Sequence, residues 1–309
     1  MADVTLLGPQ RFLPTLGRAV RAAGVEGTLA SVTAGWQERE AEDLELHEHL
    51  EERTSNLMLY ARSEEVFERD PDLFRAHRER QERLRSMQEL YRLRLAHLKR
   101  AARELAAREG DPELLEPELE AAIAALRELD AHHLARIRAV NDAFDAAWRP
   151  LERPAVARHV AEIERALAGA EALAVAGGHV AILLNRLRLF GIDRLLGSRR
   201  VFAWSAGAMA VSERVVLFHD SPPQGQGNAE VLEAGLGWSV GVVALPHARR
   251  RLALDDPLRV ALFARRFAPA HCLVLDDGSQ VVLGEAGIRA DSGVRRLTLD
   301  GRLAPMEGA

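Results

Sequence analysis

The sequence predicts an α/β fold in which helices cover both faces of a mostly parallel sheet, with a long α-helical hairpin inserted between two parts of the α/β domain. Short apolar strands alternate with helical patterns near the start of the chain and again in its second half. Between them lies a segment that is dense in charge and contains no strand pattern. We therefore expect residues 1–70 and 151–309 to form the α/β domain, and residues 71–150 to form the hairpin.

The first elements follow the alternation directly. Val4–Leu7 is a short apolar run and predicts a strand, followed by a helix at 16–23. A second strand is expected over Gly27–Thr33, with a turn at Ala34-Gly35 and a glutamate-rich helix after it. Asn56–Tyr60 predicts a third strand. Strands separated by helices in this way favour parallel pairing, because each connection has to return across the sheet.

The central segment predicts two long helices. Apolar residues recur at spacings of three and four before and after a break at Gly110-Asp111-Pro112, where glycine ends one helix and proline starts the next. The two stripes are Leu84, Met87, Tyr91, Leu95, Leu98 and Leu105, and then Leu115, Leu119, Ala122, Leu126, Leu129, Ile137 and Phe144. At 1.5 Å per residue the first helix is roughly 50 Å long, so the hairpin is expected to project from the core as an arm.

Three roles are open for this arm: self-association, docking of a partner, or a lid over an active site. Self-association into a homo-oligomer is favoured, because exposed apolar seams most often pair with a copy of themselves. Its many arginines are interleaved with glutamates, which is typical of a solvated helix face rather than of a nucleic-acid-binding surface.

The most informative stretch for function is residues 202–209. The apolar run Phe202–Trp204 ends at Ser205, and Ala206-Gly207-Ala208 follow at once. This is typical of a strand that breaks into a tight turn before a helix and lifts one side chain above the sheet. Small neighbours suit such a turn, because its backbone is strained and its N–H groups must approach a substrate. The stretch predicts a nucleophile elbow, and a buried serine in a turn of small residues is the alternative.

Other candidate residues also follow expected strands. Gly177-Gly178 come after a strand at 172–176 and before a helix, so their N–H groups are candidates to bind an oxyanion. His247 follows a strand at 240–245 and is a candidate general base. Asp276 and Asp277 follow a strand at 271–275, and either carboxylate can orient an imidazole. We expect these residues and the serine to meet at the carboxyl edge of one parallel sheet. Taken singly, each also fits a turn or a solvated loop.

This set of segments resembles the peptidase E and cyanophycinase family of serine exopeptidases, which have the class I glutamine amidotransferase-like fold, a three-layer sandwich. The segments that carry the resemblance are Gly177-Gly178, Trp204-Ser205-Ala206-Gly207-Ala208, Gly235-Leu236-Gly237 with Pro246-His247, and Leu275-Asp276-Asp277-Gly278-Ser279 with Val281-Val282-Leu283. The resemblance covers residues 155–300 well and residues 1–60 weakly.

The resemblance assigns a role to each candidate residue. It implies Ser205 as the nucleophile and His247 as the base. Asp277 is implied as the third member of the triad, with Asp276 close behind. The backbone N–H groups of Gly178 and Ala206 are implied as the oxyanion hole.

Two departures separate the chain from that family. Leu245 and Pro246 stand where cyanophycinases have acidic and amide residues before the histidine. His179-Val180 follows the two glycines in place of an amide-bearing side chain. Those family residues hold a polar substrate, so the resemblance does not carry cyanophycin or beta-aspartyl-arginine over as substrates.

The residues around the expected site suggest a substrate class. Arg249 and Arg251 closely follow the histidine and are candidates to bind a substrate carboxylate, although solvated helix arginines are an equally plain interpretation. With Gly177 and His179 they make up the expected substrate-binding set, and small acidic peptides rank first. His219-Asp220 either lines the pocket or is a loop pair.

Composition narrows the class of protein. The net charge of -5 gives no basic footprint for nucleic acid, and no segment is long and apolar enough for a membrane span. The single cysteine, Cys272, excludes a disulfide framework, and the N-terminus lacks a signal-peptide pattern, so a cytoplasmic protein is expected. No histidine or cysteine cluster has the spacing of a metal site, and no cofactor is expected.

Two function classes follow from these patterns. The first is a serine hydrolase, an exopeptidase or amidase that acts on small peptides through a Ser-His-Asp triad. The second is a non-catalytic relative that uses the pocket and the helical arm for binding or assembly. The enzyme is favoured, because a binding protein has no need of all three catalytic side chains. A glutamine amidotransferase is disfavoured, because that chemistry needs cysteine where Ser205 stands.

Overall fold

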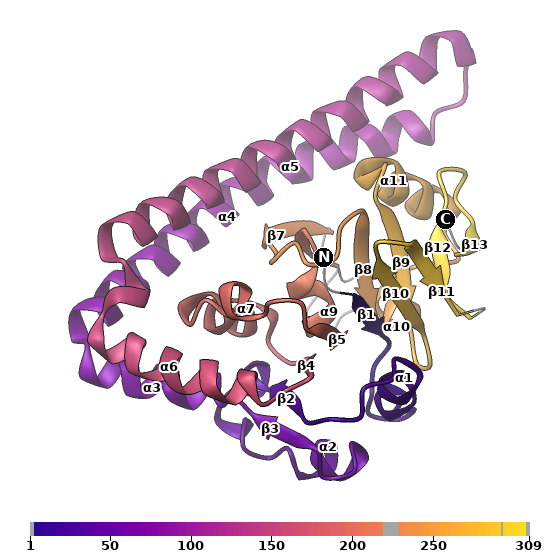
Figure 1. The fold of residues 1–309 in the computed structure, drawn as a ribbon. Coiled ribbons are helices and arrows are strands. Elements are labelled where there is room, and N and C mark those ends of the chain that lie inside the picture. The colour runs from indigo at the N-terminus through magenta and orange to yellow at the C-terminus, as the bar shows by residue number, and fades with distance from the viewer. Residues whose placement is uncertain (1–2, 219–228, 292, 307–309) are drawn as a thin grey trace.

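A computed structural model describes residues 3–218, 229–291 and 293–306 and shows an α/β fold with a long helical hairpin (Figure 1). Its main sheet has seven strands in the order β11-β10-β1-β5-β4-β2-β3. The strands are β1 (Val4–Leu7), β2 (Leu29–Val32), β3 (Thr54–Asn56), β4 (Ala172–Val175), β5 (Arg200–Trp204), β10 (Gln280–Gly284) and β11 (Gly287–Ala290). The five strands from β1 to β3 in this order run parallel, whereas β10 and β11 are antiparallel. The predicted mostly parallel sheet is therefore confirmed.

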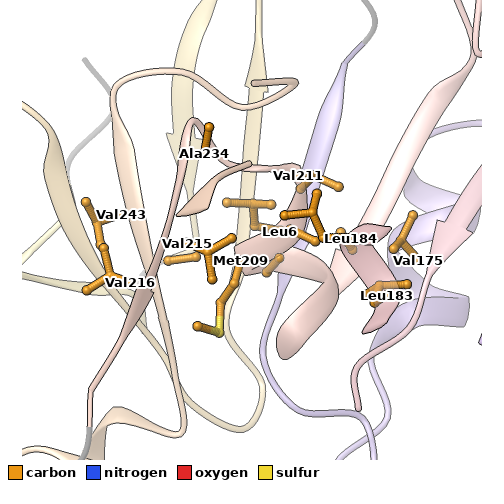
Figure 2. Packing of buried hydrophobic residues seen from close by; sticks show 14 of the residues in the cluster. Leu6, Val175, Leu183, Leu184, Met209, Val211, Val215, Val216, Ala234 and Val243 are labelled. Carbon is orange, nitrogen blue, oxygen red and sulfur yellow. The ribbon is translucent and has the colours of Figure 1, made fainter. Parts of the chain in front are cut away.

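Helices cover both faces of this sheet, because successive strand residues point to opposite sides. On one face, Leu7 and Phe202 pack with Leu16 of α1 (Leu16–Ala22) in one apolar cluster. On the other face, Leu6 and Val201 belong to a second cluster. It includes residues of the helices α3 (Leu59–Arg69), α6 (Pro154–Ala168), α7 (Val180–Leu189) and α9 (Ala206–Val211). Figure 2 shows part of this second cluster around Leu6. The three layers expected from the sequence are confirmed.

The remaining helices connect and cover these strands. They are η1 (Ala34–Arg39), α2 (Leu44–His49), α3 (Leu59–Arg69), η2 (Pro150–Glu152), α6 (Pro154–Ala168), α7 (Val180–Leu189), α8 (Ile192–Leu195), α9 (Ala206–Val211), α10 (Ala248–Arg251) and α11 (Pro257–Phe267). The expected third strand over 56–60 is wrong beyond its first residue. Asn56 ends β3 and α3 begins at Leu59, because Met58 takes a left-handed backbone conformation that leaves the strand.

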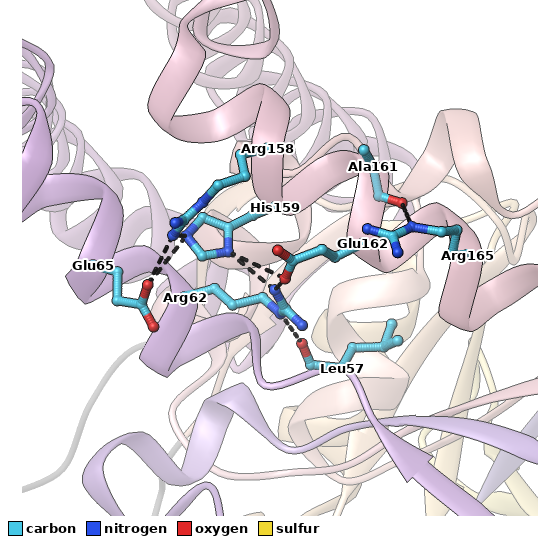
Figure 3. Close-up of polar contacts among 8 residues, drawn as sticks. All are labelled: Leu57, Arg62, Glu65, Arg158, His159, Ala161, Glu162 and Arg165. Carbon is cyan, nitrogen blue, oxygen red and sulfur yellow. Dashed lines mark hydrogen bonds and ion pairs between the residues drawn. The ribbon is translucent and has the colours of Figure 1, made fainter.

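A polar cluster ties α3 to α6 on the outer side of the sheet (Figure 3). The Arg62 guanidinium forms an ion pair with Glu162 and donates to the Leu57 carbonyl oxygen over 2.9 Å. Arg158 donates to Glu65 over 3.0 Å, and the buried His159 ring lies between the two pairs. These cross-helix contacts fix the helices that frame the sheet near β2 and β3.

The strands that carry His247 and the two aspartates lie in a second sheet, which corrects the expectation of one common sheet. This sheet has the order β13-β12-β9-β8, with β8 (Val242–Pro246) parallel to β9 (His271–Leu275). Its other members are β12 (Arg295–Leu297) and β13 (Leu303–Pro305). The free edge of β1 is occupied by β10, with Leu7 opposite Gln280, so β8 has no place there. The turn from β9 to β10 joins the two sheets.

The hairpin consists of α4 (Pro71–Ala106) and α5 (Pro112–Trp148). Asp70 caps the first helix by accepting from the Leu73 N–H, and Asp111 caps the second by accepting from the Glu113 N–H. Both aspartates stand directly before a proline, which explains why the helices start there. The predicted break between the helices is confirmed. The division of the chain at residues 70 and 150 stays a prediction.

The sequence predicts that the arm projects from the core. In the structure, the arm instead packs against the α/β body along part of its length. It runs along β7 (Glu230–Ala234), which pairs with β6 (Arg214–Leu217), and along α11. Arg266 of α11 donates two hydrogen bonds of 2.7 Å to Asp130 of α5, and Tyr91 of α4 donates to the same carboxylate over 2.7 Å. The side chains of Arg266 and Asp130 are only 3% and 4% exposed. Such a buried pair anchors the arm to the body, and self-association through the arm stays a prediction.

Candidate active site

Ser205 lies at a sharp turn between β5 and α9, and its backbone is strained. Its φ of 51° and ψ of -123° fall in a region that side chains with a Cβ rarely adopt. The turn lets α9 begin at Ala206, directly beside the end of β4. A Cβ on Gly207 would lie 2.2 Å from the Val175 carbonyl oxygen, so only glycine fits there. The small residues after the serine are thus required by the close approach of helix and sheet.

A second set of glycines forms the wall beside the serine. A Cβ on Gly177 would lie 2.8 Å from the Ser205 Cβ, so the loop after β4 passes directly against the nucleophile candidate. Gly178 has a φ of +106°, and a Cβ there would lie 2.2 Å from the Gly35 carbonyl oxygen. His179 N donates to that same oxygen over 2.7 Å. The sequence predicts only a turn at Gly35, although this residue contacts the loop beside the serine; its position three residues after the end of β2 was the available signal.

Gly178 follows the glycine that packs against Ser205, and Ala206 follows Ser205 itself, so the backbone N–H groups of both residues are candidates for an oxyanion site. Ala206 is the first residue of α9, so its N–H has no acceptor one turn earlier in the helix. Within the described ranges, neither of these N–H groups donates to another protein atom. Both N–H groups are therefore available to a hydrogen-bond acceptor from outside the chain.

His247 is the titratable group that faces the serine. Its Nε2 lies 3.5 Å from the Ser205 Oγ, although the two residues follow strands of different sheets. A left-handed backbone at His247 (φ 58°) turns the chain directly after β8, and its N–H donates to the Leu275 carbonyl oxygen over 3.1 Å. Burial lowers the pKa of His247, and the charges of Arg251 and Arg250 lower it further, whereas Asp277 raises it. The lowered pKa favours the neutral imidazole, which is able to accept a proton.

The two aspartates have different surroundings. Asp276 accepts from the Arg249 N–H over 3.2 Å, and its Oδ2 lies 3.4 Å from the Arg249 Nε. Burial raises the pKa of Asp276. Asp277 is exposed, and its charge acts on His247. In the described part of the chain, neither carboxylate forms a hydrogen bond with the His247 ring.

The expected substrate-binding residues lie around this centre with different degrees of exposure. Gly177 is buried against the serine, whereas His179 is exposed and caps α7 by accepting from the Ile182 N–H over 3.3 Å. Arg251 is half-buried beside His247, and Arg249 is exposed and paired with Asp276. His219 and Asp220 lie outside the described residues.

The described residues contain neither a candidate metal site nor a helix suited to span a membrane. Among residues 3–218, 229–291 and 293–306, histidine, cysteine, aspartate and glutamate side chains do not gather in threes in an arrangement that could hold a metal ion. Over the same residues, none of the helices combines the length and the apolar character that crossing a bilayer requires.

Two peptidases are among the solved structures to which this chain is similar. A peptidase from an acI-B1 Actinobacterium is similar over 100% of this chain and 95% of that chain, with 11% identity and a TM-score of 0.47. A putative peptidase E protein from Listeria monocytogenes EGD-e is similar over 45% of this chain and 66% of that chain, with 16% identity and a TM-score of 0.31. The second belongs by its description to the group that the sequence resembles. No protein-family model and no curated protein matches this chain. At this level of similarity, activity has to be argued from the site.

Proposed function

We propose that this protein is a serine hydrolase, an exopeptidase or amidase, with Ser205 as nucleophile and His247 as general base. The observation that carries the proposal is the 3.5 Å separation of Ser205 Oγ and His247 Nε2 at a strained turn. A contact of this length is typical of a resting nucleophile–base pair that tightens when substrate binds. A glycine would adopt this backbone without strain, so the presence of a serine supports a role for its hydroxyl.

In the proposed reaction the Ser205 Oγ attacks the carbonyl carbon of a peptide or amide, and its proton passes to the His247 Nε2. The N–H groups of Gly178 and Ala206 stabilise the negative charge that develops on the carbonyl oxygen. The protonated imidazole then gives its proton to the leaving amine, and the C–N bond breaks. Water, deprotonated by the same imidazole, hydrolyses the resulting ester and regenerates the serine.

Asp277 is our candidate for the residue that stabilises the imidazolium. Its charge favours the protonated form of His247, because it raises the pKa of that ring. Asp276 is less suited to this role, because its carboxylate is already held by Arg249. A rotation of the exposed Asp277 side chain toward the ring is all that the proposal requires.

For the substrate we propose small peptides that end in, or carry, a carboxylate. Arg251 is half-buried and its charge lowers the pKa of His247, which supports a contact between Arg251 and a substrate group next to the scissile bond. A guanidinium at that position can bind a carboxylate through two hydrogen bonds. Turnover of a dipeptide library should therefore favour acidic or free C-terminal residues, and Arg251→Met should raise KM more than it lowers kcat.

Labelling with a fluorophosphonate probe tests the proposed function. The wild-type protein should be labelled at a single site, and Ser205→Ala should abolish labelling without changing the circular dichroism spectrum. Ser198→Ala is a matched control, because Ser198 is exposed and lies outside the site. Labelling that persists in Ser205→Ala would refute the assignment. A folded wild-type protein that is never labelled would favour the alternative, a non-catalytic relative that binds ligands.

A further inference from the structure

A polar cavity of about 460 Å³ lies at the base of the arm. It lies between α4, α5 and the turn from α7 to α8, and residues 234–236 close one side. None of the residues assigned to the hydrolase site lines it. Its volume is within the usual range of small-molecule sites. The proposed hydrolase function makes no use of this cavity.

The floor of the cavity holds two buried polar atoms without partners. His77 is 7% exposed, and its Nε2 makes no hydrogen bond to any described residue. Arg80 lies with its guanidinium 4.2 Å from the centre of the Phe144 ring, and its Nη2 donates to the Asn185 Oδ1 over 3.2 Å. The Arg80 Nε is buried and likewise has no partner among the described residues. Buried donors are costly to leave unsatisfied, so this floor is suited to an acceptor from outside the chain.

Arg80 carries the positive charge of the floor. Arg80 forms no ion pair within 4 Å in the described ranges, whereas the nearby Arg188 is paired with Glu233. Burial lowers the pKa of Arg80 to about 10, although the carboxylates of Glu233 and Asp145 raise it from beyond ion-pair distance, so the guanidinium is still charged at neutral pH. Burial also lowers the pKa of His77 to about 3, so the imidazole is neutral. One carboxylate is enough to complete such a floor.

The mouth of the cavity is different, because it carries exposed carboxylates. Asp142 and Asp145 of α5 and Asp193 of α8 line it and form no ion pair with a described residue. Arginines also line the mouth, so its net charge is small. Carboxylates in this position attract an ammonium group and repel a ligand with several negative charges.

We propose that this cavity binds an α-amino acid, as the zwitterion, with an apolar side chain. Its carboxylate accepts from the Arg80 Nε and the His77 Nε2 on the floor, and its ammonium group faces Asp142 and Asp145. The apolar side chain packs against the Phe144 ring and Leu189, which lie in the same wall. Because amino acids are products of peptide hydrolysis, such a site would let product bind away from the serine.

Calorimetric titration of the Ser205→Ala protein tests this site without turnover. L-leucine is expected to bind, whereas N-acetyl-L-leucine, which lacks the ammonium group, and L-leucinamide, which lacks the carboxylate, should each bind at least tenfold more weakly. Arg80→Met should weaken L-leucine binding at least tenfold. Arg83→Met is the matched control on the same helix, because Arg83 is exposed and does not line the cavity.

A second variant keeps the test decisive where Arg80→Met does not fold. Asp145→Asn should weaken binding of L-leucine but not of N-acetyl-L-leucine. Absence of L-leucine binding up to millimolar concentration, binding of either analogue as tight as that of L-leucine, tighter binding of inorganic phosphate, or unchanged binding in both variants would each overturn the proposal. These outcomes are independent of phosphonate labelling, so failure here and failure of the hydrolase assignment are distinguishable.

Discussion

Replacing Ser205 by glycine is expected to make the protein more stable while it removes the proposed activity. The serine is held at φ 51° and ψ -123°. A conformation of this kind costs a residue with a Cβ roughly 1–3 kcal/mol. Glycine removes that cost, but its larger freedom in the unfolded chain returns about 0.5–1 kcal/mol. The contact with His247, at 3.5 Å, is too long to add much stability.

The net gain in the free energy of unfolding is therefore about 1 kcal/mol. With an unfolding entropy of roughly 2.1 cal/mol/K for each of the 309 residues, this raises Tm by about 1–2 °C. Urea unfolding followed by circular dichroism measures the free energy, and phosphonate labelling measures the chemistry. Ser205→Ala is the comparator, because it keeps the Cβ and hence the strain.

Gln37 offers a matched control for the strain argument. It has nearly the same backbone conformation, with φ 60° and ψ -126°. Gln37→Gly should thus gain a similar stability while phosphonate labelling is retained. If Ser205→Gly proves less stable than Ser205→Ala, the strain is not stored at this turn and the reasoning is wrong.

Three further variants test the site and the arm. Asp277→Asn removes a charge that raises the pKa of His247, so the acid limb of the pH profile of the labelling rate should move to lower pH. A shift of this limb to higher pH would contradict the proposed contact. Gly178→Ala would put a Cβ 2.2 Å from a backbone oxygen at a φ of +106°, and we expect loss of labelling together with a lower urea midpoint. Arg266→Met leaves Asp130 buried without its cation and should cost about 3–5 kcal/mol in urea unfolding. A loss below about 1 kcal/mol there would mean that this pair does not anchor the arm.

The sequence alone predicts much of the fold, because the relevant signals are local. The alternation of strands and helices, the turn from strand to helix at Ser205 and the break between the arm helices all appear where they were expected. Asp70 and Asp111, each directly before a proline, mark the two helix starts without reference to any other part of the chain. The error at Asn56–Tyr60 arose because an apolar run of this length suits a strand and a helix start equally well.

Long-range pairing could not be predicted in the same way. That His247 belongs to a second sheet depends on β10 taking the free edge of β1, a choice made between segments almost the whole chain apart. That Asp276 pairs with Arg249 depends in turn on β8 and β9 lying side by side. From the sequence, either Asp276 or Asp277 could be the residue that orients the imidazole, because adjacent residues at a strand end differ only in the direction that the turn gives their side chains.

The sequence by itself determined which residues are candidates for the proposed chemistry: a hydroxyl at a turn of small residues, an imidazole and carboxylates at strand ends, and glycines where backbones must come close. Only the tertiary structure decided which of these meet, because the 3.5 Å approach of Ser205 and His247 joins two sheets. The tertiary structure also decided which charged side chains are buried. In the sequence, Asp130, Arg266 and Arg80 look like solvated residues of charged helices. Asp130 and Arg266 are buried and Arg80 is half-buried because of what packs against those helices from far along the chain.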